Sequence, residues 1–174
     1  MLLVAFLRGI NVGGKNIVKS DQLRQIFSEL GFKPVSIVKQ SGNIIFKTNS
    51  EDLEKIAKRI QTKLNDVLGL NVSVFIRTIA QIKEIVQSNP FEDTNEESAS
   101  FLVTFLSEEP KGLEPPIRIP NSTADIVLKR DKEVYSITRG HGDGGKPNPY
   151  IEKMLKTQAT TRNWNIINEI ARTQ

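Results

Sequence analysis

The sequence predicts an α+β protein whose N-terminal part, residues 1–77, follows the ferredoxin-like order of strand, helix, strand, strand, helix and strand. An unbroken apolar run at Leu2–Leu7 predicts a buried strand, and two later segments repeat apolar residues at helical spacing. Between those helices a short polar turn separates two strand-like stretches, which is typical of a hairpin. Residues 78–174 mix helical and strand patterns again, so we predict a smaller α+β unit packed on the first.

Local patterns predict the first strand and the first helix. The run Leu2–Leu7 ends at Arg8 and Gly9 after six residues, as expected for a strand that is buried on both faces. Ser20 precedes the next periodic segment, where a serine side chain typically caps free backbone N–H groups. Gly31 stands where a helix ends through a left-handed residue. The predicted buried stripe of this helix consists of Leu23, Ile26, Phe27 and Leu30.

A hairpin and a second helix complete the first part. Val35–Lys39 alternates in polarity and follows Pro34, which favours a strand at the edge of a sheet. The turn Gln40–Asn43 leads to a returning strand that begins at Ile44. The second helix has acidic residues in its first turn, ends at Gly69, and is followed by a fourth strand. Its apolar stripe is Leu53, Ile56, Ala57, Ile60, Leu64 and Val67, and the fourth strand covers residues 71–76.

The second part is less regular. Its four prolines between Pro110 and Ser122 predict an extended, irregular segment, and a glycine-rich loop occupies residues 140–149. The other predicted elements are a helix at 79–86 that stops at Asn89 and Pro90, a strand at 101–106, a hairpin of 125–129 with 133–137, and helices at 150–156 and 163–172.

The composition excludes several kinds of protein. The chain has 174 residues, a formal net charge of +4, no cysteine and a single histidine, His141. The lack of cysteine excludes disulfides, thiol nucleophiles and thiolate zinc sites. No apolar run is long enough to span a membrane, and no basic residue precedes the apolar start as it does in a secretory signal. We therefore expect a cytoplasmic protein.

The charge is unevenly distributed along the chain. Residues 1–50 contain seven Lys or Arg and two Asp or Glu. Residues 91–134 contain five Lys or Arg and ten Asp or Glu. The basic front favours either an ordinary solvated surface or a field that attracts an anionic ligand. Phe6 and Phe46 lie within aliphatic runs of the central strands, so we expect them in the core and not on an RNA-stacking surface.

The glycine-rich loop after the first strand is the most informative segment. Gly9, Gly14 and Lys15 match the spacing of a phosphate-binding P-loop, but Asn16 replaces the Ser or Thr that binds magnesium. The next helix also begins several residues too late, which argues against nucleotide hydrolysis. Two interpretations stay open: a concave anion site of backbone N–H groups flanked by Arg8 and Lys15, or a tight loop that needs positive φ.

Topology favours binding at this loop. The first and second strands of a strand–helix–strand crossover run parallel, so their C-terminal ends meet at one edge of the sheet. The glycine loop and the turn Gln40–Asn43 should then lie about 10 Å apart, two strand spacings. The candidate ligand-binding residues are Arg8, Asn11, Gly13, Gly14 and Lys15, with Ser41, Gly42 and Asn43 opposite.

Two further groups of residues are candidate sites. Thr160–Asn165 predicts a cap and an anchoring tryptophan for the last helix, or a place for Arg162 and Asn163 in a binding cleft. His141 and Asp143 provide only two metal ligands, so we predict a surface loop and neither a metal nor a cofactor.

Three segments together carry a family resemblance: Leu7–Asn16, Gln40–Phe46 and Thr160–Asn165, with Asn89-Pro90-Phe91 as a weaker fourth. On these motifs the chain resembles the bacterial domain-of-unknown-function 1697 family. The resemblance implies an α+β fold with a ferredoxin-like N-terminal part, and it implies no activity.

We therefore predict a non-catalytic module, with no catalytic residue, that binds a phosphate-bearing small molecule or nucleic acid. One alternative is a protein-interaction or self-association module that uses an exposed sheet edge. Another is an uncharacterised enzyme of phosphate chemistry. A salt titration separates the first prediction from the others, because binding to a phosphate backbone weakens steeply with salt.

Overall fold

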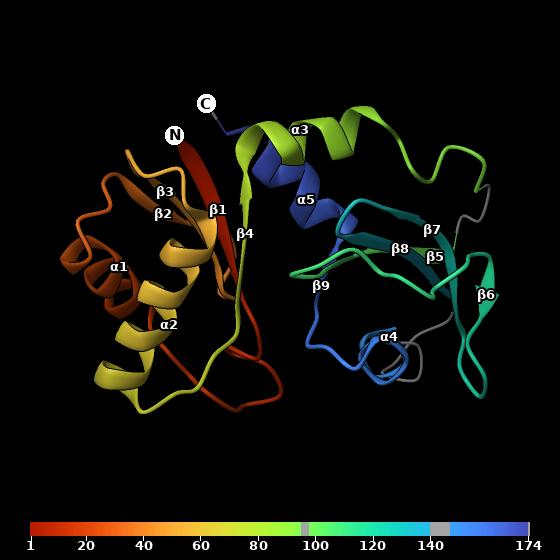
Figure 1. Cartoon of the computed structure of the whole chain (residues 1–174), viewed down its shortest axis with the longest axis horizontal. Coiled ribbons are helices and arrows are strands. Elements are labelled where there is room, and N and C mark those ends of the chain that lie inside the picture. The colour runs from red at the N-terminus through yellow and green to blue at the C-terminus, as the bar shows by residue number, and fades with distance from the viewer. Residues whose placement is uncertain (95–97, 140–146, 174) are drawn as a thin grey trace. The chain divides into compact units, whose positions relative to one another are not determined.

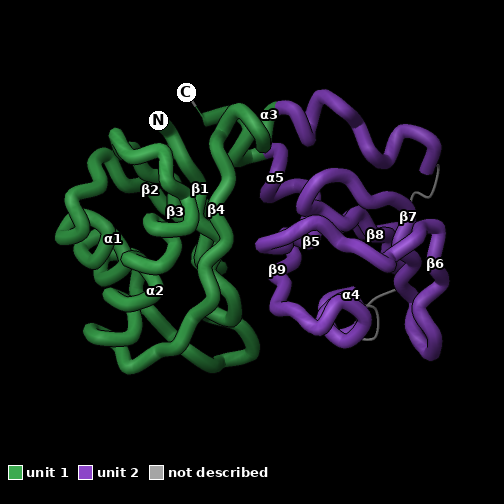
Figure 2. The backbone as a smooth tube through the Cα atoms, in the orientation of Figure 1, with its two compact units in different colours: residues 1–83, 169–174 green, residues 84–168 purple. Residues whose placement is uncertain are grey.

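The computed structural model describes residues 1–94, 98–139 and 147–173, and these form a mixed α+β protein with two antiparallel sheets and five helices. The chain divides into two compact units, residues 1–83 with 169–174 and residues 84–168 (Figure 2). The sequence pattern predicts this boundary after residue 77. Among the described helices, none is both long enough and apolar enough to cross a membrane.

The first unit contains one four-stranded antiparallel sheet in the order β2-β3-β1-β4 (Figure 1). Two helices, α1 and α2, connect its strands. In chain order its elements are β1 (Leu2–Leu7), α1 (Ser20–Glu29), β2 (Val35–Ile37), β3 (Asn43–Lys47), α2 (Leu53–Leu68) and β4 (Val74–Thr78). The short strand β2 lies at the edge of the sheet, as the proline before it predicted.

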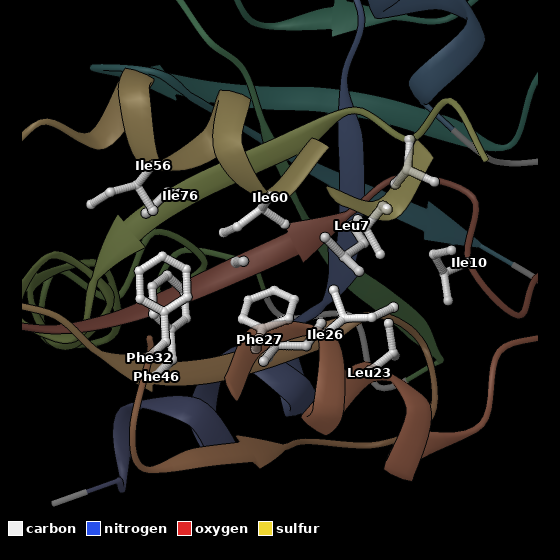
Figure 3. Packing of buried hydrophobic residues seen from close by; sticks show 14 of the residues in the cluster. Leu7, Ile10, Leu23, Ile26, Phe27, Phe32, Phe46, Ile56, Ile60 and Ile76 are labelled. Atoms are coloured by element: carbon white, nitrogen blue, oxygen red, sulfur yellow. The ribbon is translucent and has the colours of Figure 1, made fainter. Parts of the chain in front are cut away.

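The core of the first unit lies between the sheet and the two helices (Figure 3). The Phe46 ring on β3 lies 5.3 Å from the Phe27 ring of α1 and 4.6 Å from the Phe32 ring, measured between centroids. Aromatic pairs of this kind contribute about 0.5–1.5 kcal/mol beyond their buried area. The helical stripes predicted from spacing supply the rest of this core, with Leu23, Ile26, Ile56 and Ile60 buried. Val67, the last residue of the stripe predicted for the second helix, is instead 47% exposed.

Strand β1 is buried on both of its faces, which confirms the expectation from its continuous apolar run. Leu3, Ala5 and Leu7 point into the core shared with α1 and α2, while Val4 and Phe6 alternate to the opposite face and are also fully buried. Phe6 and Phe46 are therefore packing residues, and neither ring is exposed for stacking on a base.

The helix ends agree with the sequence patterns except at one cap. Ser20 is the first residue of α1, and the cap position belongs to Lys19, which makes no capping side-chain bond. The prediction of a serine cap is therefore wrong. Helix α2 is capped by Asp52, whose carboxylate accepts the Lys55 N–H at 2.9 Å, and it ends at Gly69 with φ of 66° as predicted.

The second unit contains a five-stranded antiparallel sheet in the order β6-β7-β8-β5-β9. The predicted hairpin around residue 131 is formed by β7 and β8. The elements are α3 (Ile79–Gln87), which begins in the first unit, β5 (Ala99–Phe105), β6 (Ile117–Arg118), β7 (Ala124–Arg130), β8 (Glu133–Arg139), α4 (Asn148–Leu155), β9 (Thr160–Asn163) and α5 (Trp164–Ala171).

The last strand, β9, differs from the sequence prediction. Residues 160–163 pair antiparallel with β5, so the final helix begins at Trp164 and not at Asn163. Asn163 still performs the predicted capping role, because its Oδ1 accepts the Asn165 N–H at 2.9 Å. Trp164 packs edge-on against Phe91, with 5.2 Å between ring centroids, and so anchors the helix.

Candidate binding site at the end of the first strand

The glycine loop that follows β1 contains a small hairpin. The Lys15 N–H donates to the Val12 carbonyl at 3.0 Å, and the Asn11 N–H donates to the Asn16 carbonyl at 3.1 Å. Gly13 and Gly14 occupy the turn with φ of 58° and 73°. Positive φ at both central residues is the geometry of a type I′ turn, which glycine adopts without strain. The two glycines are therefore required by the turn itself.

Two asparagine side chains fix the base of this hairpin. The Asn11 Oδ1 accepts the Val18 N–H at 2.7 Å, and its Nδ2 donates to the Val18 carbonyl at 3.1 Å and to the Gln40 carbonyl at 2.6 Å. The Asn16 Nδ2 donates to the Gly9 carbonyl at 3.0 Å. Both Asn11 N–H donors are used within the protein, so this amide holds the loop and has no donor left for a ligand.

The turn between β2 and β3 lies directly against the glycine loop. The Leu7 N–H donates to the Gly42 carbonyl at 2.8 Å, and Asn11 reaches the Gln40 carbonyl as described above. A Cβ on Gly42 would lie 3.0 Å from the Leu7 Cβ and 3.1 Å from the Leu7 carbonyl oxygen. The two loops thus share one edge of the sheet and are in contact, closer than the strand spacing suggested.

The turn before β3 uses its polar side chains internally. Asn43 is fully buried, and its Nδ2 donates to the Val38 carbonyl at 2.9 Å and to the Ser41 Oγ at 3.0 Å. The Asn43 carbonyl also accepts the Val38 N–H at 2.9 Å. Of the three candidates in this turn, Gly42 is a packing position, Asn43 closes the turn, and Ser41 supports Asn43.

The exposed part of the site is the tip of the hairpin, residues 12–17. Gly13, Gly14 and Lys15 are exposed, and a Cβ built on either glycine meets no atom within 4 Å. Val12 and Ile17 are 53% and 76% exposed, although valine and isoleucine are among the residues most often fully buried. The sequence analysis did not single out these two residues. Their spacing fits neither a helical stripe nor the alternation of a strand, and this could have indicated that they lie outside the core.

The electrostatic character of the tip is positive. Residues 8–20 contain Arg8, Lys15 and Lys19 and no acidic residue. Lys39, in the neighbouring turn, lies 3.6 Å from Glu169, and both side chains are exposed. The Arg8 main chain is fixed because its N–H donates to the Ser73 carbonyl at 2.9 Å. An exposed, cationic and partly apolar tip, whose base is held by Asn11 and Asn16, is suited to contact an extended anionic surface.

The remaining candidates, Arg162 and Asn163, lie on β9 in the second unit. Arg162 is buried, and its Nη1 donates to the Thr160 Oγ1 at 2.7 Å and to the Thr161 carbonyl at 2.9 Å. Burial lowers the pKa of Arg162 to about 10, so the guanidinium keeps its charge at neutral pH. Its hydrogen bonds tie it to its own strand, and Asn163 caps α5.

His141 and Asp143 lie outside the described residues. Over residues 1–94, 98–139 and 147–173, no group of three or more His, Asp or Glu side chains could hold a metal ion.

Comparisons with known proteins found a matching family model and a similar solved structure. A family model described as "Protein of unknown function (DUF1697)" matches residues 1–135, so the motif at 160–165 lies beyond the matched region. A solved structure, that of the conserved bacterial protein SP0830 from Streptococcus pneumoniae, is similar over 98% of this chain and 97% of its own. Its TM-score is 0.67 at 21% identity, which shows a shared fold. No curated protein matches the chain.

Proposed function

The chain belongs to the DUF1697 family of proteins of unknown function, and because membership brings no activity with it, we propose from its own geometry a non-catalytic module that binds nucleic acid. The proposed contact is the phosphate backbone, and the contacting element is the hairpin tip at residues 12–17. The observation that carries the proposal is an exposed tip, held by Asn11, with no acidic residue between positions 8 and 20.

The turn glycines support this assignment. Because Gly13 and Gly14 have no Cβ and open space beside them, a phosphate group can approach the main-chain N–H groups of the turn. Lys15 is adjacent and supplies a mobile ammonium group, which binds phosphate as a point charge. A projecting turn also favours an extended partner over a small molecule that would need to be enclosed.

The charge of the tip sets the expected salt dependence. If Lys15 and Lys19, with or without Arg8, neutralise two to three phosphates of duplex DNA, affinity should fall about 10- to 40-fold between roughly 50 and 200 mM salt. Fluorescence anisotropy with a labelled duplex and a labelled single strand measures this slope directly. A flat salt response for both oligonucleotides would refute the proposal.

A pair of variants localises the contact. Lys15→Gln should weaken binding and reduce the salt slope by about one unit, independent of base sequence. The matched control is Lys83→Gln, which removes an exposed lysine on α3 and should leave both quantities unchanged. Equal losses in the two variants would show a non-specific charge effect instead of a contact at the tip.

The exposed apolar side chains favour a second candidate, docking of the tip on another protein. Val12 and Ile17 would supply the apolar contact. Ile17→Ser distinguishes the two functions, because it should abolish protein docking and leave the salt slope of nucleic-acid binding unchanged. Pairing through the edge strand β2 has less support, because three residues offer few ladder bonds.

We also assign the first unit to the ferredoxin-like arrangement. The order of its elements and the strand order β2-β3-β1-β4 support this assignment. The assignment concerns architecture alone, since one fold hosts many functions.

A further inference from the structure

A basic pocket lies at the end of the first unit's sheet opposite to the glycine loop. It has a volume of about 330 Å³ and is lined by the turn after α1, the end of β3 with the residues that follow it, and Arg59 on α2. We propose that this pocket binds the phosphate group of a small phosphomonoester. Its cationic lining residues are Lys33, Lys47 and Arg59.

The pocket concentrates positive charge without a competing carboxylate. Three segments distant in sequence each contribute one cation, and none of the described lining residues is acidic. Of the acidic residues close to the lining in sequence, Glu29 pairs with Lys63 at 2.8 Å and Asp52 caps α2. Glu51, which follows Ser50, is exposed to solvent, which screens its charge. A dianion in the pocket therefore meets three cations and little repulsion, and a phosphomonoester carries close to two negative charges at neutral pH.

The guanidinium group of Arg59 is held in place before any ligand arrives. Its Nη2 donates to the Leu30 carbonyl at 3.0 Å, and its Cζ lies 5.6 Å from the centroid of the Phe32 ring. Phe32 in turn packs against Phe46 in the core, with the two rings tilted by 38° (Figure 3). Arginine has five N–H donors, and the bond to Leu30 uses one of them. A prepositioned guanidinium loses less entropy on binding, and its fork suits two oxygens of one phosphate.

Neutral polar groups complete the lining. The Ser50 N–H donates to the Thr48 Oγ1 at 3.1 Å, which leaves the Thr48 hydroxyl proton to donate elsewhere. Asn49 and Ser50 also line the pocket. The amino group of Met1 donates to the Thr48 carbonyl at 2.6 Å and so fixes this strand end with a further positive charge nearby. The volume lies at the lower end of the range for small-molecule sites, which fits a compact ligand.

This site is separate from the tip proposed to contact nucleic acid. Lys47 pairs with Leu2 at the start of β1, and the glycine loop leaves β1 after Leu7. Five steps along a strand place the two sites about 17 Å apart. Each proposal can therefore fail without the other.

The test is a titration of the full chain with inorganic phosphate and with glycerol 3-phosphate at constant ionic strength, followed by amide chemical shifts. Saturable shifts at residues 30–33, 47–50 and 59 in the low millimolar range are expected, with chloride alone producing none. No saturable shift at these amides with either phosphate would overturn the proposal.

Variants separate a specific pocket from general charge attraction. Lys33→Gln and Lys47→Gln change exposed side chains, and each should weaken phosphate binding about tenfold, as expected for the loss of one charge-assisted contact. Arg59→Lys should weaken it by a similar factor, because the charge stays and the fork is lost. The control Lys83→Gln, which changes an exposed lysine on α3 outside both proposed sites, should leave phosphate binding unchanged. Equal weakening by Lys83→Gln, or binding only to oligonucleotides or to anionic vesicles and not to the soluble phosphates, would refute a small-molecule site.

Discussion

Substitution of Gly42 by alanine tests the close contact between the two loops. The added Cβ would lie 3.0 Å from the Leu7 Cβ, 3.1 Å from the Leu7 carbonyl oxygen and 3.3 Å from the Ile10 Cβ. Gly42 also has φ of 73°, where an L side chain costs about 1–2 kcal/mol. Overpacking against buried neighbours costs a further 1–3 kcal/mol or so. We expect Gly42→Ala to destabilise the protein by about 2–5 kcal/mol.

The matched control for this substitution is Gly13→Ala at the hairpin tip. Gly13 has φ of 58° but no atom within 4 Å of a built Cβ, so only the backbone term of about 1–2 kcal/mol applies. Urea unfolding followed by circular dichroism gives the free energy of unfolding for both variants, and the Leu7 amide should exchange faster in Gly42→Ala. Equal destabilisation in the two variants would show that the contact with Leu7 does not constrain the turn.

Of three further predictions, two concern hydrogen bonds and one concerns the pKa of Glu29. Asn11→Ala should destabilise the loop by about 2–3 kcal/mol, since three hydrogen bonds are lost, and hydrogen exchange at residue 18 should rise; unchanged exchange would contradict the anchoring role. Thr161→Val should cost about 1–3 kcal/mol in thermal unfolding, because its hydroxyl bonds Thr104 across the β5–β9 pair, and Thr161→Ser should recover most of it. The hydrogen bond from Lys63 is the main cause that lowers the pKa of Glu29, with Gln25 second, so Lys63→Gln should raise that pKa toward 4.5 in a carboxyl NMR titration. Lys58→Gln is the control for that titration, and an unmoved Glu29 pKa in Lys63→Gln would refute the pairing.

The helices of the first unit were predictable because their apolar residues repeat at one spacing over several turns. Leu23, Ile26 and Phe27 face the core in α1, and Gly69 ends α2, as the pattern indicated. The prediction of a serine cap is wrong because a polar residue at the start of a helix occupies either the cap position or the first turn. The local sequence does not distinguish these two positions.

Strand β9 was not predictable from its residues. Thr160–Asn163 has no apolar alternation, and its strand conformation comes from antiparallel pairing with β5, a segment more than fifty residues earlier. Long-range pairing of this kind overrides local propensity, which for threonine fits both a cap and a strand.

The sequence predicted where the two loops of the candidate site lie, but not which of their side chains are bonded within the protein. The topological rule brought the glycine loop and the turn before β3 to one edge of the sheet, because chain connectivity alone determines this. Which polar groups would remain available was not predictable. Asn11 and Asn43 are the residue types expected at a ligand site, yet their amides bind neighbouring main-chain carbonyls. Side-chain pairing of that kind depends on distances that the sequence does not contain.

The division of the chain has a consequence for the order in which the protein assembles. Residues 169–174 belong to the first unit, and Ile170 among them is fully buried. A ribosome therefore synthesises the whole of the second unit before the first has received its last piece. Until then the nascent first unit lacks residues 169–174, so it is completed only after the second unit has been synthesised.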